Sequence, residues 1–568
     1  MIGKQKSLLG PDMSRMRALI KAMGFTDEEL ARPRIGVANT WGETSPGHYH
    51  LRNLAEAVKA GIWQAGCTPV EFGSFAMCAL EALDSSIRYD LPTRDIIAAD
   101  VEACTNLHLF DGLVLISSCD KNVPAHLLAA ARLDIPAIVL PGGPMRVGTY
   151  QGRPTIITDL DKETFKYAAG KGTMPLDEMH ELEDKACPGC GACQLLGTAN
   201  TMQCMAEALG MALPLASTAP ADGGERLRLA KKTGVRAAEL VRRGLRPSQI
   251  MTAGAVENAI RVLHAISGST NAVVHLLALI EELDLQRPVT LDTFEKLGQD
   301  TPFIADVRPS GQYPMEAFHD AGGIPAVMRQ ISGLLDLDVP TVAHDSLRAQ
   351  LAAYPLRDDR VIHALDRPIA DMGIVILRGN LARSAVTRPM VSGGRRSFRG
   401  PARVFDSLEE AIQGVKDGRL QKGEALVLRY EGPRGGPGCT DIFGLMGLLG
   451  GAGLDADCAV ITDGKASGFC EGFYVVQVSP EAYLGGPLAL VRTGDLVEID
   501  VAHGRLNAAL PEEELERRRA AWVQPQPRIT RGFLTVYHHL ALPVERGGGI
   551  NLRLGAAQQD NRTGGQNL

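Results

Sequence analysis

The sequence predicts an α/β protein with two domains: a doubly wound domain built on a parallel sheet, followed by a β-rich domain. Short, fully apolar segments alternate with helical segments in the first third of the chain, which is typical of a doubly wound sheet. After about residue 370, short β-rich segments separated by Gly and Pro replace this pattern. The chain has 568 residues, which is room for both domains at roughly 150 residues each.

The order of the elements in the first domain predicts the parallel sheet. Apolar residues recur at helical spacing from Leu51 to Ile62. The continuous apolar run after residue 111 is typical of a strand covered by helices on both faces. The predicted elements are the strand Arg34–Asn39, the helix His50–Gly66, the strand Gly112–Ser117, the helix Pro124–Leu133 and the strand Ala137–Leu140.

The second domain begins after a polar stretch at residues 358–368. Residues 225–360, before this stretch, have the periodic Leu, Ala and Val pattern of helices. We therefore divide the chain into residues 1–368 and residues 369–568. The segments beyond the boundary predict a β-rich domain, of which a closed barrel is one form. They are Ile374–Leu377, Ala425–Tyr430, Ala459–Thr462, Phe473–Val478 and Leu496–Val501.

Composition and charge exclude several classes of protein. Lys and Arg number 59 against 66 Asp and Glu, giving a net charge of −7, which disfavours broad binding to nucleic acid or to an anionic membrane. No apolar run is long enough for a membrane span. Met1–Gly24 lacks the apolar stretch and the cleavage site of a secretory signal, so we expect a cytoplasmic protein.

The 11 cysteines are an odd number in a chain expected to be cytoplasmic. Disulfides are rare in that compartment, so clustered cysteines there indicate metal or redox chemistry. Cys187, Cys190 and Cys193 have C-x₂-C-x₂-C spacing, which lets several sulfur atoms converge on one metal site. No nearby second C-x₂-C or His pair completes a four-ligand zinc site. The alternative is a set of packing cysteines beside a Gly-rich turn.

A second candidate site follows the buried strand of the first domain. Ser118, Cys119, Asp120 and Lys121 stand at a strand end, where ligands of parallel sheets collect. Cysteine is a soft ligand suited to iron–sulfur clusters or zinc, whereas aspartate is a hard ligand suited to Mg²⁺. The alternative is a solvated loop with a buried thiol.

Two segments of the second domain also carry candidate functional residues. Glu431 stands at a strand end and begins the Gly/Pro run that ends at Gly438; the alternative is an ordinary hairpin connection with a solvated glutamate. Ser467 lies between Gly-bearing turns and is a candidate nucleophile or base. It is not the G-x-S-x-G elbow, because Lys465 stands two residues before it, and an ordinary turn serine is the alternative. Ser267–Asn271 is rich in small residues that can present backbone N–H groups to an anion.

Together these segments resemble the dihydroxy-acid dehydratase / phosphogluconate dehydratase family, which includes sugar-acid dehydratases. The resemblance covers nearly the whole chain, and the order and spacing of the segments also match. The matching segments are Cys119–Pro124, Pro188–Cys193, Thr198–Met202, Gly268–Asn271, Gly322–Val327, Gly379–Ala382, Tyr430–Gly438, Thr462–Gly468 and Ser479–Ala482.

The resemblance implies an iron–sulfur enzyme with Mg²⁺ beside the cluster, and an α/β domain joined to a β-barrel of the aconitase-swivel kind. It implies that Cys119 and Cys193 ligate the cluster, that Asp120 and Glu431 ligate Mg²⁺, that Lys121 is a carbamylated metal ligand, and that Ser467 is the base. Lys465, Ser269 and Thr270 lie in matching segments, and we expect them to bind substrate. Members of the family are homodimers or dimers of dimers.

The sequence departs from the family pattern at two candidate ligands. Gly47 stands where many members have their first cluster cysteine; some members with glycine there carry a 4Fe–4S cluster, which favours 4Fe–4S over 2Fe–2S. The third ligand is then Cys190 or Cys78. The usual acidic Mg²⁺ ligand is missing after residue 72, and Glu81 is the nearest carboxylate, with a glutamate on a helix surface as the alternative.

The predicted function is removal of water from a 2,3-dihydroxy carboxylic acid, giving a 2-keto acid. Branched-chain dihydroxy acids are the first choice of substrate, because Leu91–Arg94, Gly148–Gly152 and Thr198–Met202 are most similar to that branch. Aldonates are the second choice, favoured by Pro124, Ala125 and the segment 531–548. The alternative from another class is a non-catalytic iron–sulfur sensor with a labile cluster. Neither nucleic acid nor membrane is an expected partner.

Overall fold

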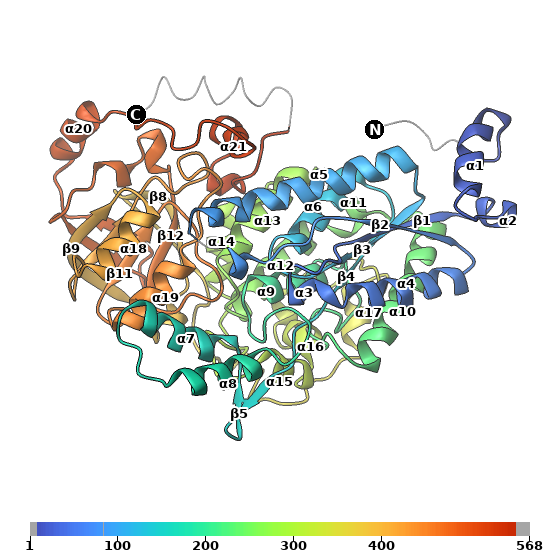
Figure 1. The fold of residues 1–568 in the computed structure, drawn as a ribbon, viewed down its shortest axis with the longest axis horizontal. Coiled ribbons are helices and arrows are strands. Elements are labelled where there is room, and N and C mark those ends of the chain that lie inside the picture. Colours follow the sequence, from blue (N-terminus) through green and yellow to red (C-terminus); the bar gives the residue numbers. More distant parts are fainter. Residues whose placement is uncertain (1–7, 83, 553–568) are drawn as a thin grey trace.

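The structure is a computed structural model that describes residues 8–82 and 84–552. One half of the molecule contains an open sheet covered by helices, and the other half contains a barrel (Figure 1). This combination confirms the predicted fold class. Among the described residues, none of the helices is both long enough and apolar enough to cross a membrane.

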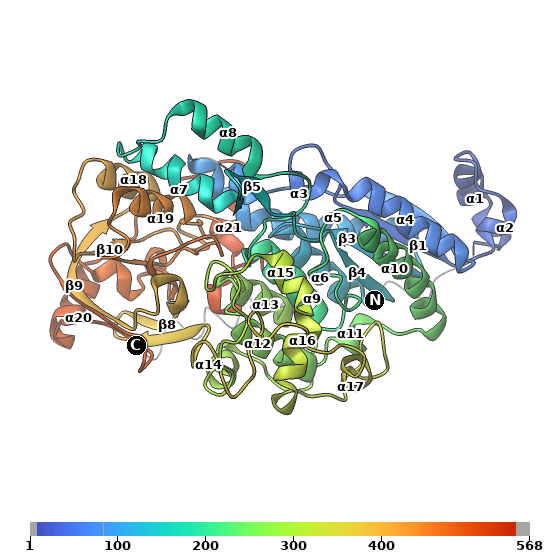
Figure 2. The same cartoon turned by 90° about the horizontal axis from the view of Figure 1, so that it is seen from below.

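The open sheet has four parallel strands in the order β2-β1-β3-β4. Helices α4 and α10 cover one face, and α5 and α6 cover the other (Figures 1 and 2). Every residue of β3 is buried, as expected for a strand between two helical layers. The elements are β1 (Arg34–Asn39), β2 (Thr68–Gly73), β3 (Gly112–Ser117), β4 (Ala137–Pro141), α4 (Leu51–Gln64), α5 (Asp90–His108), α6 (Asn122–Leu133) and α10 (Gly224–Arg243).

Two glycines let α4 and α10 pack closely. A Cβ on Gly61 would lie 2.1 Å from the carbonyl oxygen of Lys231, and a Cβ on Gly234 would lie 2.1 Å from that of Val58. Any side chain at either position would force the helices apart. The pair therefore covers its face of the sheet as one tightly packed layer.

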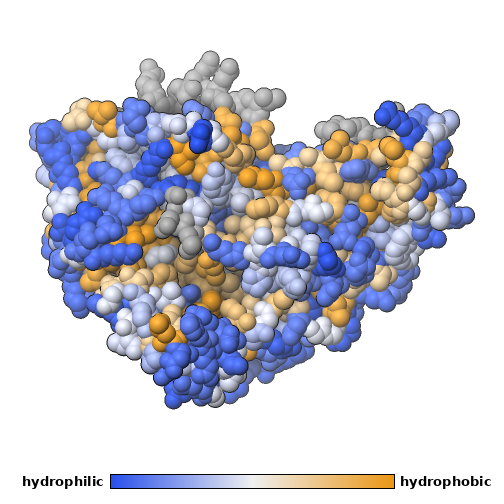
Figure 3. Space-filling view, viewed as in Figure 1, coloured by the Kyte–Doolittle hydropathy of each residue, from blue (hydrophilic) through white to orange (hydrophobic). Residues whose placement is uncertain are grey.

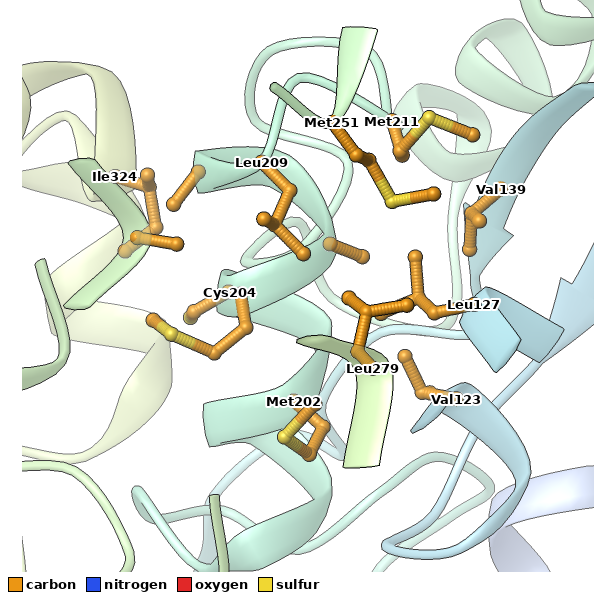
Figure 4. Packing of buried hydrophobic residues seen from close by; sticks show 14 of the residues in the cluster. Val123, Leu127, Val139, Met202, Cys204, Leu209, Met211, Met251, Leu279 and Ile324 are labelled. Atoms are coloured by element: carbon orange, nitrogen blue, oxygen red, sulfur yellow. The ribbon is translucent and has the colours of Figure 1, made fainter. Parts of the chain in front are cut away.

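The core of this half surrounds helix α9 (Thr198–Ala208), whose residues are all buried. Side chains from α6, β4, α13 (Asn271–Glu282) and α16 (Gly323–Gln330) pack around it (Figure 4). Cys204 lies within this apolar cluster, as expected for a packing thiol. The predicted helical region also contains α12 (Ala253–Ala265), α14 (Leu291–Gly298), α15 (Met315–Asp320) and α17 (Leu347–Leu351).

The second half is a closed barrel in the order β10-β11-β12-β8-β7-β14-β13-β9. Neighbouring strands from β9 to β12 run parallel, whereas the remaining pairs are mostly antiparallel. The strands are β7 (Val375–Gly379), β8 (Ala382–Thr387), β9 (Ser397–Phe405), β10 (Ala425–Leu428), β11 (Ala459–Thr462), β12 (Phe473–Ser479), β13 (Leu496–Asp500) and β14 (Arg505–Ala508).

The sequence identified five of these eight strands and did not identify β8, β9 and β14. In β9, buried residues alternate with exposed or half-exposed ones along most of the strand. An alternating strand with arginine and glycine lacks the continuous apolar run by which the other strands were found.

Contacts between the halves cross the proposed boundary at residue 368. Helix α7 (Ile157–Ala168) of the first half packs on α19 (Phe443–Ala452) of the barrel half (Figure 2). Phe165 lies so close to α19 that a Cβ on Gly447 would meet its ring at 2.1 Å. From the other side, Tyr537 on α21 (Leu534–Leu540) donates a hydrogen bond of 2.6 Å to Asp95 on α5. The division into residues 1–368 and 369–568 stays a proposal.

Candidate active site

Three cysteines that are far apart in the sequence line one cavity. Cys119 follows β3, Cys78 precedes the short helix η2 (Ala79–Glu81), and Cys193 follows α8 (Leu176–Ala186). Cys119 has a φ of 52°, a left-handed conformation that clusters at functional sites when a non-glycine residue adopts it. The cavity has a volume of about 20 Å³ and is lined by Cys78, Ala79, Leu80, Cys119, Asp120, Cys193, Thr198, Ala199, Asp441, Phe443, Ser467 and Phe469.

The surroundings of the thiols suit a soft metal. A hydrogen bond with Cys78, together with burial, raises the pKa of Cys119 well above its ordinary value. Burial and the nearby Cys78 do the same to the pKa of Cys193. The protein alone therefore keeps these thiols neutral, whereas a bound metal cation would favour the thiolates that ligate it.

Gly47 provides the space beside the Cys119 thiol. It lies in the short helix α3 (Pro46–Tyr49), and a Cβ at this position would be 2.4 Å from Cys119 Sγ. Ser45 Oγ lies 3.8 Å from the same sulfur atom. Even an alanine at position 47 would displace the thiol, so glycine is required for this arrangement.

A network of buried ion pairs lies next to the thiols. Lys121 Nζ is 3.0 Å from Asp120 Oδ2 and 3.0 Å from Asp90 Oδ2. Lys465 Nζ pairs with the same oxygen of Asp90 and is 2.7 Å from Asp441 Oδ2. All five side chains are buried. Because Asp90 contacts both lysines, it connects the sheet half to the barrel half.

Burial and charge oppose each other in this network. Burial lowers the pKa of Lys465, but the carboxylates of Asp441 and Asp90 outweigh it and raise the pKa above its ordinary value. Burial raises the pKa of Asp90, but Lys121 and Lys465 outweigh it and lower the pKa. For Asp120, burial dominates and raises the pKa. Of Asp90 and Asp120, Asp120 is thus the one for which burial outweighs the attraction of the nearby ammonium groups.

Ser467 reaches the cavity on a loop after β11. Its backbone N–H donates a hydrogen bond of 3.0 Å to Asp441 Oδ1, and its Oγ accepts one of 3.4 Å from the N–H of Phe469. Asp441 therefore holds both Ser467 and Lys465, one with each carboxylate oxygen. The arrangement fixes the hydroxyl of Ser467 in the same cavity as the thiols.

A larger cleft of about 460 Å³ opens beside this cavity. It lies between α7 and α19, and Phe443 and Phe469 line both the cleft and the cavity. Figure 3 shows apolar residues gathered where the two halves of the molecule meet.

Comparison with known proteins identifies the family. Residues 32–350 match the family model for the N-terminal region of dihydroxy-acid/6-phosphogluconate dehydratases, and residues 360–548 match the model for the C-terminal region. The chain belongs to this dehydratase family. Its members remove water from their substrates, so the protein is a hydro-lyase.

Several similar relatives carry one name. The dihydroxy-acid dehydratase of Acetivibrio thermocellus is 44% identical over 544 residues, and that of Methanothrix thermoacetophila is 44% identical over 547 residues. The dihydroxy-acid dehydratase of Pyrococcus abyssi is 42% identical over 543 residues. Each of these matches covers 95% of this chain and 98% of the relative.

For this member of the family, the structure places Cys78 rather than Cys190 with the other thiols. Cys78 lines the cavity together with Cys119 and Cys193. Cys190 is half-exposed and Cys187 is exposed, and neither lines the cavity. Of the C-x₂-C-x₂-C run, only the last cysteine lines the cavity.

The two predicted glutamate ligands have different surroundings. Glu431 is fully buried, and its Oε1 accepts hydrogen bonds from the Leu408 N–H at 2.9 Å and from Arg528 at 2.7 Å. Its Oε2 accepts one from the hydroxyl of Thr440. Glu81 is exposed at the end of η2 and does not line the cavity. Its role as a metal ligand stays a prediction.

The predicted substrate-binding residues Ser269 and Thr270 lie behind the cavity, where they support its loops. Ser269 Oγ is 2.8 Å from the hydroxyl of Thr198, which lines the cavity. Thr270 donates a hydrogen bond of 3.1 Å to the carbonyl of Ala466, next to Ser467. Neither residue lines the cavity, and Lys465 is held by Asp90 and Asp441.

The sequence analysis did not identify Asp90 and Asp441 as site residues. Asp441 stands three residues after the segment that ends at Gly438, so its place near that motif was a usable signal. Asp90 begins a helix, where an acidic residue is ordinary, and no local pattern distinguishes it. Residues 8–82 and 84–552 contain no group of three or more His, Cys, Asp or Glu side chains that are placed to hold a metal ion.

Proposed function

We propose that this protein is a dihydroxy-acid dehydratase that uses an iron–sulfur cluster and Mg²⁺ to convert a branched-chain 2,3-dihydroxy carboxylate into a 2-keto acid. One observation carries the proposal: three thiols, the Asp120 carboxylate and the Ser467 hydroxyl share a single cavity. The relatives named above carry the name of this activity over almost the entire chain.

The donor set of the cavity fits an iron–sulfur cluster held by Cys78, Cys119 and Cys193. Thiolates are the ligands of such clusters, and three of them leave one iron of a 4Fe–4S cluster without a protein ligand. The space beside Gly47 keeps the sulfur of Cys119 accessible. When bound, the cluster would supply a Lewis acid for the departing C3 hydroxyl.

The residues proposed for Mg²⁺ are Asp120, Lys121 and Glu431. Asp120 is buried beside the thiols, and a cation would offset the burial that raises the pKa of its carboxyl group. A carbamate on Lys121 would add a second anionic oxygen donor at the same place. Bound Mg²⁺ would hold the carboxylate and the C2 hydroxyl of the substrate and make the C2 proton more acidic.

Ser467 is the proposed base for the C2 proton. A serine hydroxyl is an intrinsically weak base, so its anionic form needs stabilisation from its surroundings. The N–H of Phe469 points at Oγ, and Asp441 holds the backbone of the same loop. Proton transfer to Oγ needs no movement of the loop, because Ser467 already lines the cavity.

The lining of the cavity favours a branched hydrocarbon chain over the hydroxyl-rich chain of an aldonate. Leu80, Phe443 and Phe469 supply apolar surface to the lining, which also contains the polar groups that would bind the carboxylate. Hydroxyl groups beyond C3 would be buried against these side chains without hydrogen-bond partners, which is unfavourable.

The test begins with anaerobic purification and quantification of iron and sulfide. The protein is then assayed for 2-keto acid formation from a branched-chain 2,3-dihydroxy acid and from an aldonate, with Mg²⁺ present. We expect turnover of the branched-chain substrate. Turnover of the aldonate alone would show that the substrate is a sugar acid and not a branched-chain dihydroxy acid. No keto acid from either, with the cluster and Mg²⁺ confirmed, would refute the proposal.

The quaternary state and location are part of the same proposal. We propose a cytoplasmic homodimer or dimer of dimers, supported by the family resemblance. Light scattering coupled to size-exclusion chromatography tests the assembly, and a monomeric mass would refute it.

A further inference from the structure

Asp90 is a buried carboxylate with one oxygen that the protein leaves unsatisfied. It is the first residue of α5, and its side chain has no exposed surface. Its Oδ2 contacts both Lys121 and Lys465. Its Oδ1 is also buried but has no hydrogen-bond partner among the described residues. A buried carboxylate oxygen without a donor is costly, so its position points to a group that binds there.

The unsatisfied oxygen belongs to a carboxylate that converges with Asp120. Lys121 Nζ lies 3.0 Å from Asp90 Oδ2 and 3.0 Å from Asp120 Oδ2, so both carboxylates surround the same point. Asp120 also lines the thiol cavity. Two carboxylates from different elements therefore meet at the place proposed for the divalent cation. Oxygen donors of this kind are the ligands that hard cations prefer.

The other two acidic candidates are less available than Asp90. Both oxygens of Glu431 already accept hydrogen bonds, from Leu408, Arg528 and Thr440. Glu81 is exposed and lies outside the cavity lining. Asp90 is the candidate that is both buried and open at one oxygen.

We infer that Asp90 is a further ligand of the divalent cation, sharing the ion with Asp120. This inference rests on the cation site of the proposed function but assigns to it a residue from a different element. Three carboxylates, of Asp90, Asp120 and Asp441, face two ammonium groups in the network. A carbamate on Lys121 would make the excess of negative charge larger. A divalent cation between Asp90 and Asp120 offsets that excess.

The competing explanation is that Asp90 only neutralises Lys121 and Lys465. The two explanations differ in one measurable property, the affinity for the ion. A counter-ion acts on the ion only through Lys121 and Asp120, so its replacement costs at most the roughly 10–100-fold that loss of an outer partner of a metal ligand costs. Loss of a ligand costs more.

The experiment titrates the full-length protein, with its cluster, with Mn²⁺ as a paramagnetic probe, and the free ion is followed by electron paramagnetic resonance. The parent is compared with Asp90→Asn. The matched control is Asp95→Asn, because Asp95 lies on the same helix and is equally buried, but it accepts its hydrogen bonds from Arg94, Tyr537 and the Ile550 N–H. Circular dichroism and iron content establish that each variant is folded.

We expect Asp90→Asn to weaken Mn²⁺ binding by more than about 100-fold, which exceeds the roughly 10–100-fold cost of losing an outer partner of a metal ligand. Asp95→Asn should bind Mn²⁺ like the parent, and Mg²⁺ should displace Mn²⁺ from both. If Asp90→Asn does not fold, Asp90→Ser, which removes the carboxylate with less bulk, is titrated in the same way.

A loss of Mn²⁺ affinity of less than about 100-fold in a folded Asp90 variant overturns the inference, and so does a parent that binds no Mn²⁺. A parent that forms no keto acid, but whose Mn²⁺ binding depends on Asp90, refutes the proposed function and leaves the inference standing. The two failures are therefore distinguishable.

Discussion

The open sheet and the closed barrel place their site residues in the same way, although their architectures differ. Cys119, Asp120 and Lys121 follow the carboxyl end of β3 in the sheet. Glu431 follows β10 and Ser467 follows β11, two neighbouring strands that run parallel within the barrel. Loops at the carboxyl ends of parallel strands collect at one edge. The shared feature is therefore the parallel pairing, and closure of the barrel does not change it.

The two regions differ in how the charge of their functional groups is controlled. On the sheet side, burial and the thiol–thiol contact favour neutral Cys119 and Cys193. On the barrel side, Lys465 is paired with Asp441, and the carboxylates of Asp441 and Asp90 raise the pKa of the lysine, which favours its charged form. The thiols of the sheet half are therefore neutral and would become thiolates when a metal binds. The ammonium group of the barrel half is already paired with carboxylates. Four predictions test this contrast.

The largest expected effect is on catalysis, at Ser467. Ser467→Ala should lower turnover by about 10²–10⁴-fold, the usual contribution of a general base. Iron and sulfide content should stay at the parental level, because among the described residues the hydroxyl accepts one long hydrogen bond, from the N–H of Phe469. Turnover and iron are measured on the same preparation. Unchanged turnover would exclude Ser467 as the base. Loss of iron would indicate that Ser467 helps to hold the cluster.

The next effect concerns the third thiol. Cys78→Ser should reduce the iron and sulfide retained after anaerobic purification by about tenfold or more, because a cluster ligand is lost. Cys190→Ser is the matched control and should retain parental iron, since Cys190 does not line the cavity. The opposite result for the two variants would show that the C-x₂-C-x₂-C run, rather than Cys78, completes the cluster site.

The charged network of the barrel half is tested by Lys465→Met. Removing the lysine leaves Asp90 and Asp441 buried with less compensation, and breaking a buried ion pair costs about 3–5 kcal/mol of stability. The loss is measured as a lower urea midpoint. Lys422→Met is the control, because Lys422 forms an exposed pair with Asp457, and its urea midpoint should stay close to the parental value. Equal effects would contradict the special role of the buried network.

The smallest effect is a pH dependence of stability at Glu481. Burial raises the pKa of Glu481 from 4.5 to about 8. Folding therefore favours the protonated form, and the stability that this form contributes is full below pH 4.5 and is lost as the pH rises through 8. Glu481→Gln stays neutral and should show a smaller decline of the urea midpoint over this range. Glu498→Gln, at a half-exposed position on β13, should keep the parental decline. A parental decline in Glu481→Gln would contradict the prediction.

The sequence was a good guide to single segments and a poor guide to contacts between them. Apolar runs identified β1, β3 and β4, because a strand buried on both faces has to be apolar throughout. Motif spacing identified Cys119, Cys193 and Ser467, which do share a cavity. The choice between Cys78 and Cys190 stayed open, since it depends on which chain segment folds back over β3.

The acidic residues show the same difference. Glu81 was chosen because it is close to the expected position in the sequence, yet it is exposed. Asp90, nine residues later in the chain, is buried between two lysines that are themselves 344 positions apart. Helix α5 rises by about 1.5 Å per residue, so which of its residues meets the barrel depends on the placement of the whole helix.

The sequence by itself therefore determined the parallel sheet, the β-rich second half and the set of chemically active segments, because these follow from local periodicity and from the chemistry of each residue type. Only the tertiary structure decided which thiol joins Cys119 and Cys193, which carboxylates surround Lys121, and that Ser269 and Thr270 support the loops of the cavity. These outcomes depend on packing between the two halves, where burial without a partner is costly and residues distant in the chain supply the partner.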